Sequence, residues 1–152
     1  MASTHRRSPR VFVDADVLFA GAAAPTEHGA SLTILRMAEI TLIQAVTPQQ
    51  VITEAERNLT AKLPAALPAF HLIVSRCLHV VPDAQRAEVE ALAGRADPED
   101  LPILAAAVRE HCRWLVTFNV RPYRPGHPDV QALRPGDLLL RVRSVLAGLG
   151  SA

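Results

Sequence analysis

Short, almost wholly apolar runs alternate along the chain with longer amphipathic stretches, which is the pattern of an α/β protein. Apolar runs of this length are typical of strands that are buried on both faces, as in a parallel sheet. They predict a strand and its exit at 11–18, and further strands at 42–46, 78–81, 113–118 and 130–133. Helical periodicity predicts helices at 30–40, 48–61, 69–77, 83–94, 97–111 and 137–149. We therefore expect a mostly parallel sheet with right-handed crossovers.

Turn and capping residues set the expected boundaries of these elements. The segment 21–29 contains a proline and three alanines and is interpreted as a loop. Thr47 is expected to cap the helix that begins at Pro48, because proline is favoured at the first helical position. Asp83 is expected to cap the helix at 83–94 in the same way.

The length of 152 residues is that of one ordinary domain, and 49% of the residues are apolar. Residues 1–9 are polar and basic, so we expect a flexible basic arm there and a single domain over 10–149. The N-terminus imitates a signal peptide, but Asp14 and Asp16 would fall within its apolar part, which such a segment does not tolerate. No apolar run approaches the length of a membrane helix. We expect a cytoplasmic protein without membrane contact.

Cysteine and histidine form no metal-binding pattern in this sequence, because Cys77 and Cys112 lie far apart and no two histidines are spaced i, i+4. Of the 16 basic residues, 15 are arginine and Lys62 is the exception. Residues 109–143 contain seven arginines and three acids, a net charge of +4. Arginine suits phosphate binding through its bidentate fork, although a solvated surface in an arginine-favouring genome would give the same counts.

The first predicted strand runs directly into a pair of aspartates. Three apolar residues at 11–13 precede Asp14, and Asp16 follows two places later. Ligands of open parallel sheets bind beyond the carboxyl ends of the strands, so a carboxylate at Asp14 indicates metal or phosphate chemistry. An ordinary turn is the alternative for either aspartate and is the favoured interpretation of Asp16.

Further carboxylates lie on the predicted helix at 48–61. Val51, Ala55 and Leu59 mark its buried face, and Glu54 and Glu56 lie on opposite flanks of that face. Periodicity alone does not choose between the two glutamates. A solvated helix charge is the alternative interpretation of each.

Asp97 and Asp100 open a later predicted helix. Asp100 shares a helical face with Leu104, Ala107 and His111, so its side chain is expected to point toward the sheet. A helix cap is the alternative for Asp100. Asp97 precedes a proline, where a turn is ordinary chemistry.

Thr117 and Asn119 stand where the chain leaves the apolar run Trp114-Leu115-Val116, and a hydroxyl and an amide there can orient a water, a phosphate or a metal-bound ligand. An ordinary exit from the strand is the alternative. Carboxylates gathered at one sheet edge repel each other, and a divalent cation relieves that repulsion. Mg²⁺ or Mn²⁺ fits best, because both take oxygen ligands and keep several waters. Such a site can activate a water for attack on a phosphodiester.

The order of these motifs resembles that of PIN-domain nucleases. The matching pieces are Val-Phe-Val-Asp14-Ala-Asp16-Val-Leu, Val-Ile-Thr-Glu54-Ala-Glu-Arg57-Asn58-Leu59, Asp97-Pro-Glu-Asp100, Leu-Val-Thr117-Phe-Asn119 and Pro135-Gly136-Asp137-Leu-Leu. The resemblance covers roughly residues 10–146. No single motif is specific to the family, but the order and spacing of the four acidic and polar motifs are specific. It implies a three-layer α/β/α sandwich with a central five-stranded parallel sheet. It also implies metal-dependent cleavage of RNA by a VapC-like toxin.

The resemblance also implies a role for individual residues. Asp14, Glu54 and Asp100 would hold Mg²⁺ or Mn²⁺, with Asp97 as a possible helper. Glu54, rather than Glu56, matches the family glutamate, and Thr117 matches the hydroxyl near the fourth position. Both Thr117 and Asn119 are counted with the catalytic residues.

Two positions depart from the family pattern. Asn119 stands where the family usually has aspartate, and its missing charge would weaken the binding of a second metal. Asp16 stands where the family commonly has asparagine or another small polar residue, so its carboxylate could compensate in part.

The leading hypothesis is therefore a Mg²⁺- or Mn²⁺-dependent endoribonuclease, the toxin of a toxin–antitoxin module. Arg57, Arg121 and Arg124 are expected to contact the RNA. The expected partners are the RNA substrate, a cognate antitoxin and a second copy in a homodimer.

Two other functions remain open. The first is a catalytically weak PIN-like module that binds RNA or protein, which the neutral Asn119 supports. The second is an aspartate-dependent phosphatase resembling the haloacid dehalogenases, which Asp14-x-Asp16 supports; the downstream lysine and acidic pair that it needs are missing.

Overall fold

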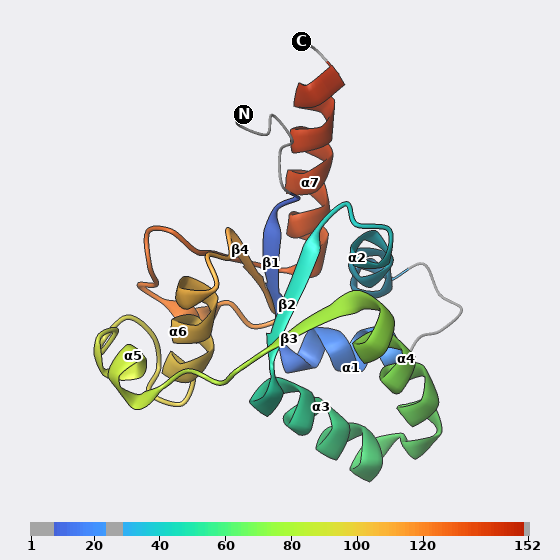
Figure 1. Ribbon diagram of the computed structural model, residues 1–152, viewed down its shortest axis with the longest axis horizontal. Coiled ribbons are helices and arrows are strands. Elements are labelled where there is room, and N and C mark those ends of the chain that lie inside the picture. The colour runs from blue at the N-terminus through green and yellow to red at the C-terminus, as the bar shows by residue number, and fades with distance from the viewer. Residues whose placement is uncertain (1–7, 24–28, 151–152) are drawn as a thin grey trace, which may run out of the picture.

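A computed structural model describes residues 8–23 and 29–150 (Figure 1). Five strands form one sheet in the order β3-β2-β1-β4-β5, and each neighbouring pair is parallel. The strands are β1 (Arg10–Val13), β2 (Gln44–Pro48), β3 (Leu78–Val81), β4 (Trp114–Val116) and β5 (Gln131–Leu133). The predicted parallel five-stranded sheet is confirmed.

Helices cover both faces of this sheet. They are α1 (Ala15–Ala23), α2 (Ala30–Glu39), α3 (Gln49–Lys62), α4 (Leu67–Cys77), α5 (Arg86–Glu90), α6 (Leu101–Arg109) and α7 (Pro135–Gly150), with short 3₁₀ turns η1 (Pro64–Ala66) and η2 (Arg121–Tyr123). Figure 1 shows α5 and α6 on one side of the sheet and α1, α2 and α4 on the other. The predicted three-layer α/β/α sandwich is therefore confirmed.

Helix α1 is the element that the hydrophobic pattern did not predict. The first strand ends at Val13, and its predicted exit up to residue 18 is instead the start of a helix, which begins at Ala15 and extends into the segment interpreted as a loop. Val17 and Leu18 are fully buried, and a helix that is apolar on most sides cannot be told from a buried strand by periodicity. Residues 24–28 of the predicted loop lie outside the described residues.

The boundary between β2 and α3 also differs from the prediction. Thr47 does not cap α3; it belongs to β2, and its buried hydroxyl donates to the carbonyl of Val13 at 3.3 Å. Pro48 ends the strand and is the residue that precedes the helix. The side chain of Thr47 thereby joins β2 to β1 instead of satisfying a helix terminus.

Asp83 caps a helix, but not the one that follows it in sequence. Helix α5 begins only at Arg86 and ends at Glu90, well before the predicted 94. The Oδ1 atom of Asp83 accepts a hydrogen bond from the backbone N–H of Gln50, at the start of α3, at 2.8 Å. This contact joins the segment after β3 to the first turn of α3.

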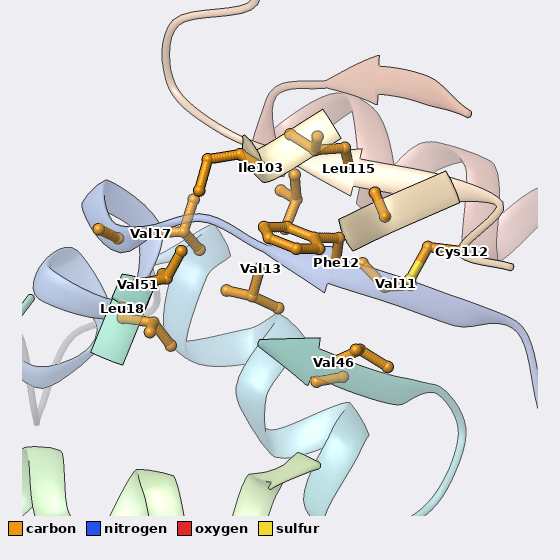
Figure 2. Close-up of a cluster of buried hydrophobic side chains, with 14 of the residues drawn as sticks. Val11, Phe12, Val13, Val17, Leu18, Val46, Val51, Ile103, Cys112 and Leu115 are labelled. Atoms are coloured by element: carbon orange, nitrogen blue, oxygen red, sulfur yellow. The ribbon is translucent and has the colours of Figure 1, made fainter. Parts of the chain in front are cut away.

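Strand β1 lies at the centre of the sheet and of the core. Val11, Phe12 and Val13 have no exposed surface, and β1 pairs with β2 on one side and β4 on the other. Figure 2 shows these side chains packed among Val46 of β2 and Leu115 of β4. After these three residues, the first position that can carry a charge is Asp14, at the carboxyl end of the strand.

The sheet order places a crevice at that same end. From β1 the chain continues to β2 and β3 in one direction, whereas β4 and β5 lie in the other, so the order switches between β1 and β4. Open parallel sheets bind ligands at the carboxyl ends of strands at such a switch point. The backbone N–H of Asp14 donates to the carbonyl of Val116 at 3.1 Å, which fixes the two strand ends side by side.

Two expectations concern the periphery of the chain. Residues 1–7 of the expected basic arm at 1–9 lie outside the described residues, and the hydroxyl of Ser8 donates to the carbonyl of Thr41 at 2.6 Å. Within the described ranges, no helix combines the length and the apolar character needed to cross a bilayer.

The cap that Asp83 provides can be tested by substitution. We expect Asp83→Ala to lower the free energy of unfolding by about 1 kcal/mol, because a first-turn amide of α3 loses its acceptor. Urea denaturation measures this change, which corresponds to roughly 2–4 °C in Tm for a chain of this length. Asp83→Asn keeps an acceptor oxygen and should cost less. Equal stability of Asp83→Ala and the unmodified protein would contradict the assignment.

Candidate active site

A cleft of about 460 Å³ opens at the carboxyl end of the sheet, beside the switch point. Its walls come from the end of β1, helices α1, α3 and α6, the segment after β4, and η2. The lining residues are Asp14, Ala15, Asp16, Phe19, Glu54, Asn58, Lys62, Asp100, Thr117, Asn119, Pro122 and Tyr123. The cleft thus brings together five of the residues that the sequence singled out, Asp14, Glu54, Asp100, Thr117 and Asn119.

Asp14 is held by two hydrogen bonds, one to each carboxylate oxygen. The backbone N–H of Ala15 donates to Oδ1 at 2.8 Å, and the hydroxyl of Tyr123 donates to Oδ2 at 2.9 Å. Tyr123 is only 5% exposed. Burial, and next the charge of Asp14, raise the pKa of Tyr123 far above its usual value, so the hydroxyl remains a donor at neutral pH. No sequence motif indicated this contact.

Tyr123 owes its position to contacts between its loop and the acidic turn before α6. The backbone N–H of Asp97 donates to the carbonyl of Pro122 at 2.8 Å, and that of Gly126 donates to the carbonyl of Arg95 at 2.8 Å. Gly126 has a φ of +84°, and a Cβ there would lie 2.9 Å from the carbonyl oxygen of Tyr123. Glycine is therefore needed to bring the two segments together.

Asp16 points to the segment that follows β4. Its Oδ2 atom accepts hydrogen bonds from the backbone N–H of Phe118 at 3.0 Å and from the hydroxyl of Thr117 at 3.3 Å. The same hydroxyl accepts a bond from the backbone N–H of Asn119 at 3.3 Å. Thr117, 1% exposed, therefore connects Asp16 to Asn119 rather than facing solvent.

The second oxygen of Asp16 is buried without a hydrogen-bond partner among the described residues. Burial, and then the charge of Asp14, raise the pKa of Asp16 to about 6. Sequence reasoning favoured a turn for this residue because its spacing from Asp14 is ordinary for turns. The contact with Phe118 depends on the β1–β4 pairing, which no local pattern shows.

Glu54 and Asp100 complete the acidic group of the cleft. Burial, and then the charge of Asp14, raise the pKa of both carboxyls, and the charge of Asp100 also raises the pKa of Glu54. Arg57 opposes the rise at Glu54. These carboxylates, which come from three different elements, therefore lie close enough to repel one another.

The structure also separates the two glutamates that periodicity could not. Glu54 lines the cleft, whereas Oε2 of Glu56 lies 3.2 Å from Nε2 of His71 in α4. Val51, Ala55 and Leu59 are buried between these flanks, as the sequence predicted. Glu54 is thus the glutamate of the site.

The remaining sequence candidates lie around the cleft. Arg57 lines a smaller hollow of about 210 Å³ that shares Asp14, Glu54 and Asp100 with the main cleft. The side chain of Asp97 lines neither hollow, although its charge also raises the pKa of Asp100. Two further arginines, Arg121 and Arg124, are exposed and line neither hollow.

Two polar residues of the cleft wall were not predicted as part of the site. Asn58 and Lys62 line the cleft together with Glu54, because residues spaced i, i+4 and i+8 share one face of α3. The same spacing, applied to Glu54 as the reference, would have identified both from the sequence. Lys62, the single lysine of the chain, places a positive charge in a cleft that is otherwise acidic.

The donor set of the cleft suits a hard divalent cation. Carboxylate oxygens are the ligands that Mg²⁺ and Mn²⁺ prefer, and the buried oxygen of Asp16 lacks a partner. Over residues 8–23 and 29–150, no three His, Cys, Asp or Glu side chains are already gathered as a coordination sphere. The residues fit the cation by charge and chemistry rather than by preformed ligand geometry.

The sequence profile of the PIN domain matches residues 10–121, nearly three-quarters of the chain, and includes every acidic residue of the cleft. The chain belongs to the PIN domain family. No curated protein sequence matches it at a significant level.

Solved structures resemble this PIN domain in fold. PAE2754 from Pyrobaculum aerophilum superposes with a TM-score of 0.64 at 20% identity, covering 90% of this chain and 97% of that one. The structure of VapBC2 from Rickettsia felis, bound to a DNA fragment from its promoter, gives 0.60 at 15%, covering 82% and 98%. VapC20 from Mycobacterium tuberculosis, a sarcin–ricin loop cleaving toxin, gives 0.54 at 18%, covering 72% and 90%.

The Tyr123–Asp14 hydrogen bond is expected to stabilise the PIN domain. Tyr123→Phe should lower the free energy of unfolding by about 1–2 kcal/mol, since a bond to a charged acceptor is lost while the ring remains buried. A double-mutant cycle with Asp14→Asn, measured by urea denaturation, isolates this pair. The cost of Tyr123→Phe should shrink when Asp14 is asparagine. An identical cost in both backgrounds would show that the bond contributes nothing.

Asp16 predicts an unusual dependence of stability on pH. Its pKa is raised from the ordinary value of 3.8 to about 6, so between these values the folded protein binds more protons than the unfolded chain. The free energy of unfolding in EDTA should therefore decrease as pH rises from about 4 to about 6. Chemical denaturation at several pH values measures the slope, and Asp16→Asn should make it flatter. A slope that is unchanged in Asp16→Asn would assign the dependence to other groups.

Proposed function

We propose that this PIN domain is a Mg²⁺- or Mn²⁺-dependent endoribonuclease and the toxin of a toxin–antitoxin module. One observation carries the proposal: Asp14, Glu54 and Asp100 come from three separate elements and line one open cleft at the switch point of a PIN-domain sheet. Membership of the family supports nuclease chemistry over the phosphatase that Asp14-x-Asp16 suggested.

In the proposed reaction, Asp14, Glu54 and Asp100 hold the cation, with Asp97 adding negative charge beside Asp100. When bound, the cation would lower the pKa of a water and neutralise charge on the phosphodiester. Tyr123 keeps the carboxylate of Asp14 in one orientation through its hydroxyl.

The RNA backbone must approach a cleft whose floor is negatively charged. Cationic side chains at the rim would offset that repulsion and hold phosphates on either side of the cleaved bond. Lys62 lines one end of the cleft, and Arg57 lines the adjoining hollow. Arg121 is the first residue of η2 and Arg124 follows it, and both are exposed. These two arginines would hold phosphates of the RNA outside the cleft.

The proposed partners are RNA, a cognate antitoxin and a second copy of the chain in a homodimer, in the cytoplasm. The likeness to VapBC2, a toxin–antitoxin complex, and to the toxin VapC20 supports the antitoxin and the RNA substrate. An antitoxin segment that enters the cleft would need basic side chains to pair with its carboxylates.

A second candidate function is a catalytically weak PIN module that binds RNA without cutting it. Asn119 favours this alternative, because it lines the cleft with a neutral amide. The two candidates differ in their response to metal: the silent module should not bind Mn²⁺ at micromolar to low millimolar concentrations.

Cleavage of labelled RNAs in Mn²⁺ and in EDTA tests the proposal. We expect cleavage only with the metal, and we expect Asp14→Asn to reduce it by at least roughly 100-fold while the far-ultraviolet circular dichroism is unchanged. Asp129→Asn is the matched control, because Asp129 is exposed and lines neither hollow at the acidic edge.

Cleavage that persists in EDTA or in Asp14→Asn would exclude the proposed chemistry. Mn²⁺ binding without cleavage of any RNA in the set would favour a narrow substrate range, and neither binding nor cleavage would favour the silent module.

A further inference from the structure

The side of the cleft formed by the segment after β4 carries no acidic residue of its own. Thr117, Phe118 and Asn119 supply a hydroxyl, a ring and an amide. The cleft carboxylates of Glu54 and Asp100 belong to α3 and to the start of α6. Any cation in the cleft would therefore lack a charged ligand from the β4 side unless another element provides one.

Asp16 provides one. It lies in the first turn of α1, and its Oδ2 atom accepts hydrogen bonds from both Phe118 and Thr117, at 3.0 and 3.3 Å. Because Thr117 in turn accepts from the backbone N–H of Asn119, Asp16 and Asn119 are joined through one hydroxyl. Both residues line the same cleft.

The second carboxylate oxygen of Asp16 indicates that this residue does more than join two segments of the chain. Joining α1 to the segment after β4 requires only one oxygen, and Oδ2 makes both bonds. The Oδ1 atom is buried and has no partner of hydrogen-bond geometry within the described part of the chain, although the backbone N–H of Val17 also acts on this carboxylate and lowers its pKa. A buried carboxylate oxygen without a donor is costly, and an ion that is part of the functional site is one of the ordinary explanations.

We propose that Asp16 supplies the fourth carboxylate of the metal centre, on the side where Asn119 offers only an amide. This inference rests on the proposed function, since it concerns the same cation. It makes Asp16 a ligand of the cation through Oδ1, while Oδ2 keeps the segment after β4 in place.

The test moves the carboxylate from position 16 to position 119 and the amide from position 119 to position 16. Mn²⁺ binding to the full chain is measured by isothermal titration calorimetry for the unmodified protein, Asp16→Asn, Asn119→Asp and the double variant. We expect Asp16→Asn to weaken binding by roughly 10–100-fold. The double variant should restore the affinity to within about threefold of the unmodified protein, because Asn119→Asp returns a carboxylate to the same side of the cleft.

Asn119→Asp cannot replace the contact of Asp16 with Phe118, so rescue by it separates a ligand from a positioning role. Asp16→Ser, whose hydroxyl still accepts a hydrogen bond, is the second neutral variant in case Asp16→Asn folds poorly. Asp129→Asn is the matched control for loss of one acid and should bind Mn²⁺ as the unmodified protein does.

Two results would overturn the inference and leave the proposed function intact: undiminished Mn²⁺ binding by both neutral variants, or weakened binding that Asn119→Asp fails to restore. Absence of Mn²⁺ binding by the unmodified protein would overturn both. RNA cleavage, measured in parallel, is not needed to judge the role of Asp16.

Discussion

Repulsion between carboxylates at the end of a buried strand is the constraint on which this PIN domain depends. Val11, Phe12 and Val13 of β1 are wholly buried, so Asp14 is the first residue after them that can carry charge. Glu54 and Asp100 then approach from two other elements, and after burial the charge of Asp14 raises the pKa of both. The fold tolerates this arrangement by directing donors at the acids, with Tyr123 bonded to Asp14 and Phe118 to Asp16.

The sheet was predictable because all five strands are parallel and most are buried on both faces, which leaves continuous apolar runs in the sequence. Helix α1 escaped the same reasoning, because a buried helix and a buried strand are both apolar without interruption. The cap of α3 escaped it for another reason. Sequence rules look for a cap in the residues just before the helix. Asp83 instead follows the carboxyl end of β3 and accepts its hydrogen bond from Gln50, 33 positions earlier in the sequence.

The site was predictable to the extent that its residues follow strands or open helices. Asp14 and Asp100 could be placed at the sheet edge by that rule, and the family resemblance chose Glu54 over Glu56. The contacts of Tyr123 and Asp16 required the tertiary structure, whereas Lys62 follows from helical spacing once Glu54 is taken as the reference. Tyr123 reaches Asp14 across 109 positions of sequence, and Asp16 reaches Phe118 across 102, so no local pattern could indicate either pair.

The bond from Asp83 to α3 means that the wall carrying Glu54 is attached at a point outside the cleft. A residue outside the cleft thereby shares in setting the orientation of Glu54, the glutamate that we propose holds the cation. Because the donor is the backbone N–H of Gln50, position 50 can carry any residue except proline, whereas position 83 needs a side chain with an acceptor oxygen. This requirement at position 83 lies outside the motifs of the cleft, so a comparison of those motifs alone would overlook it.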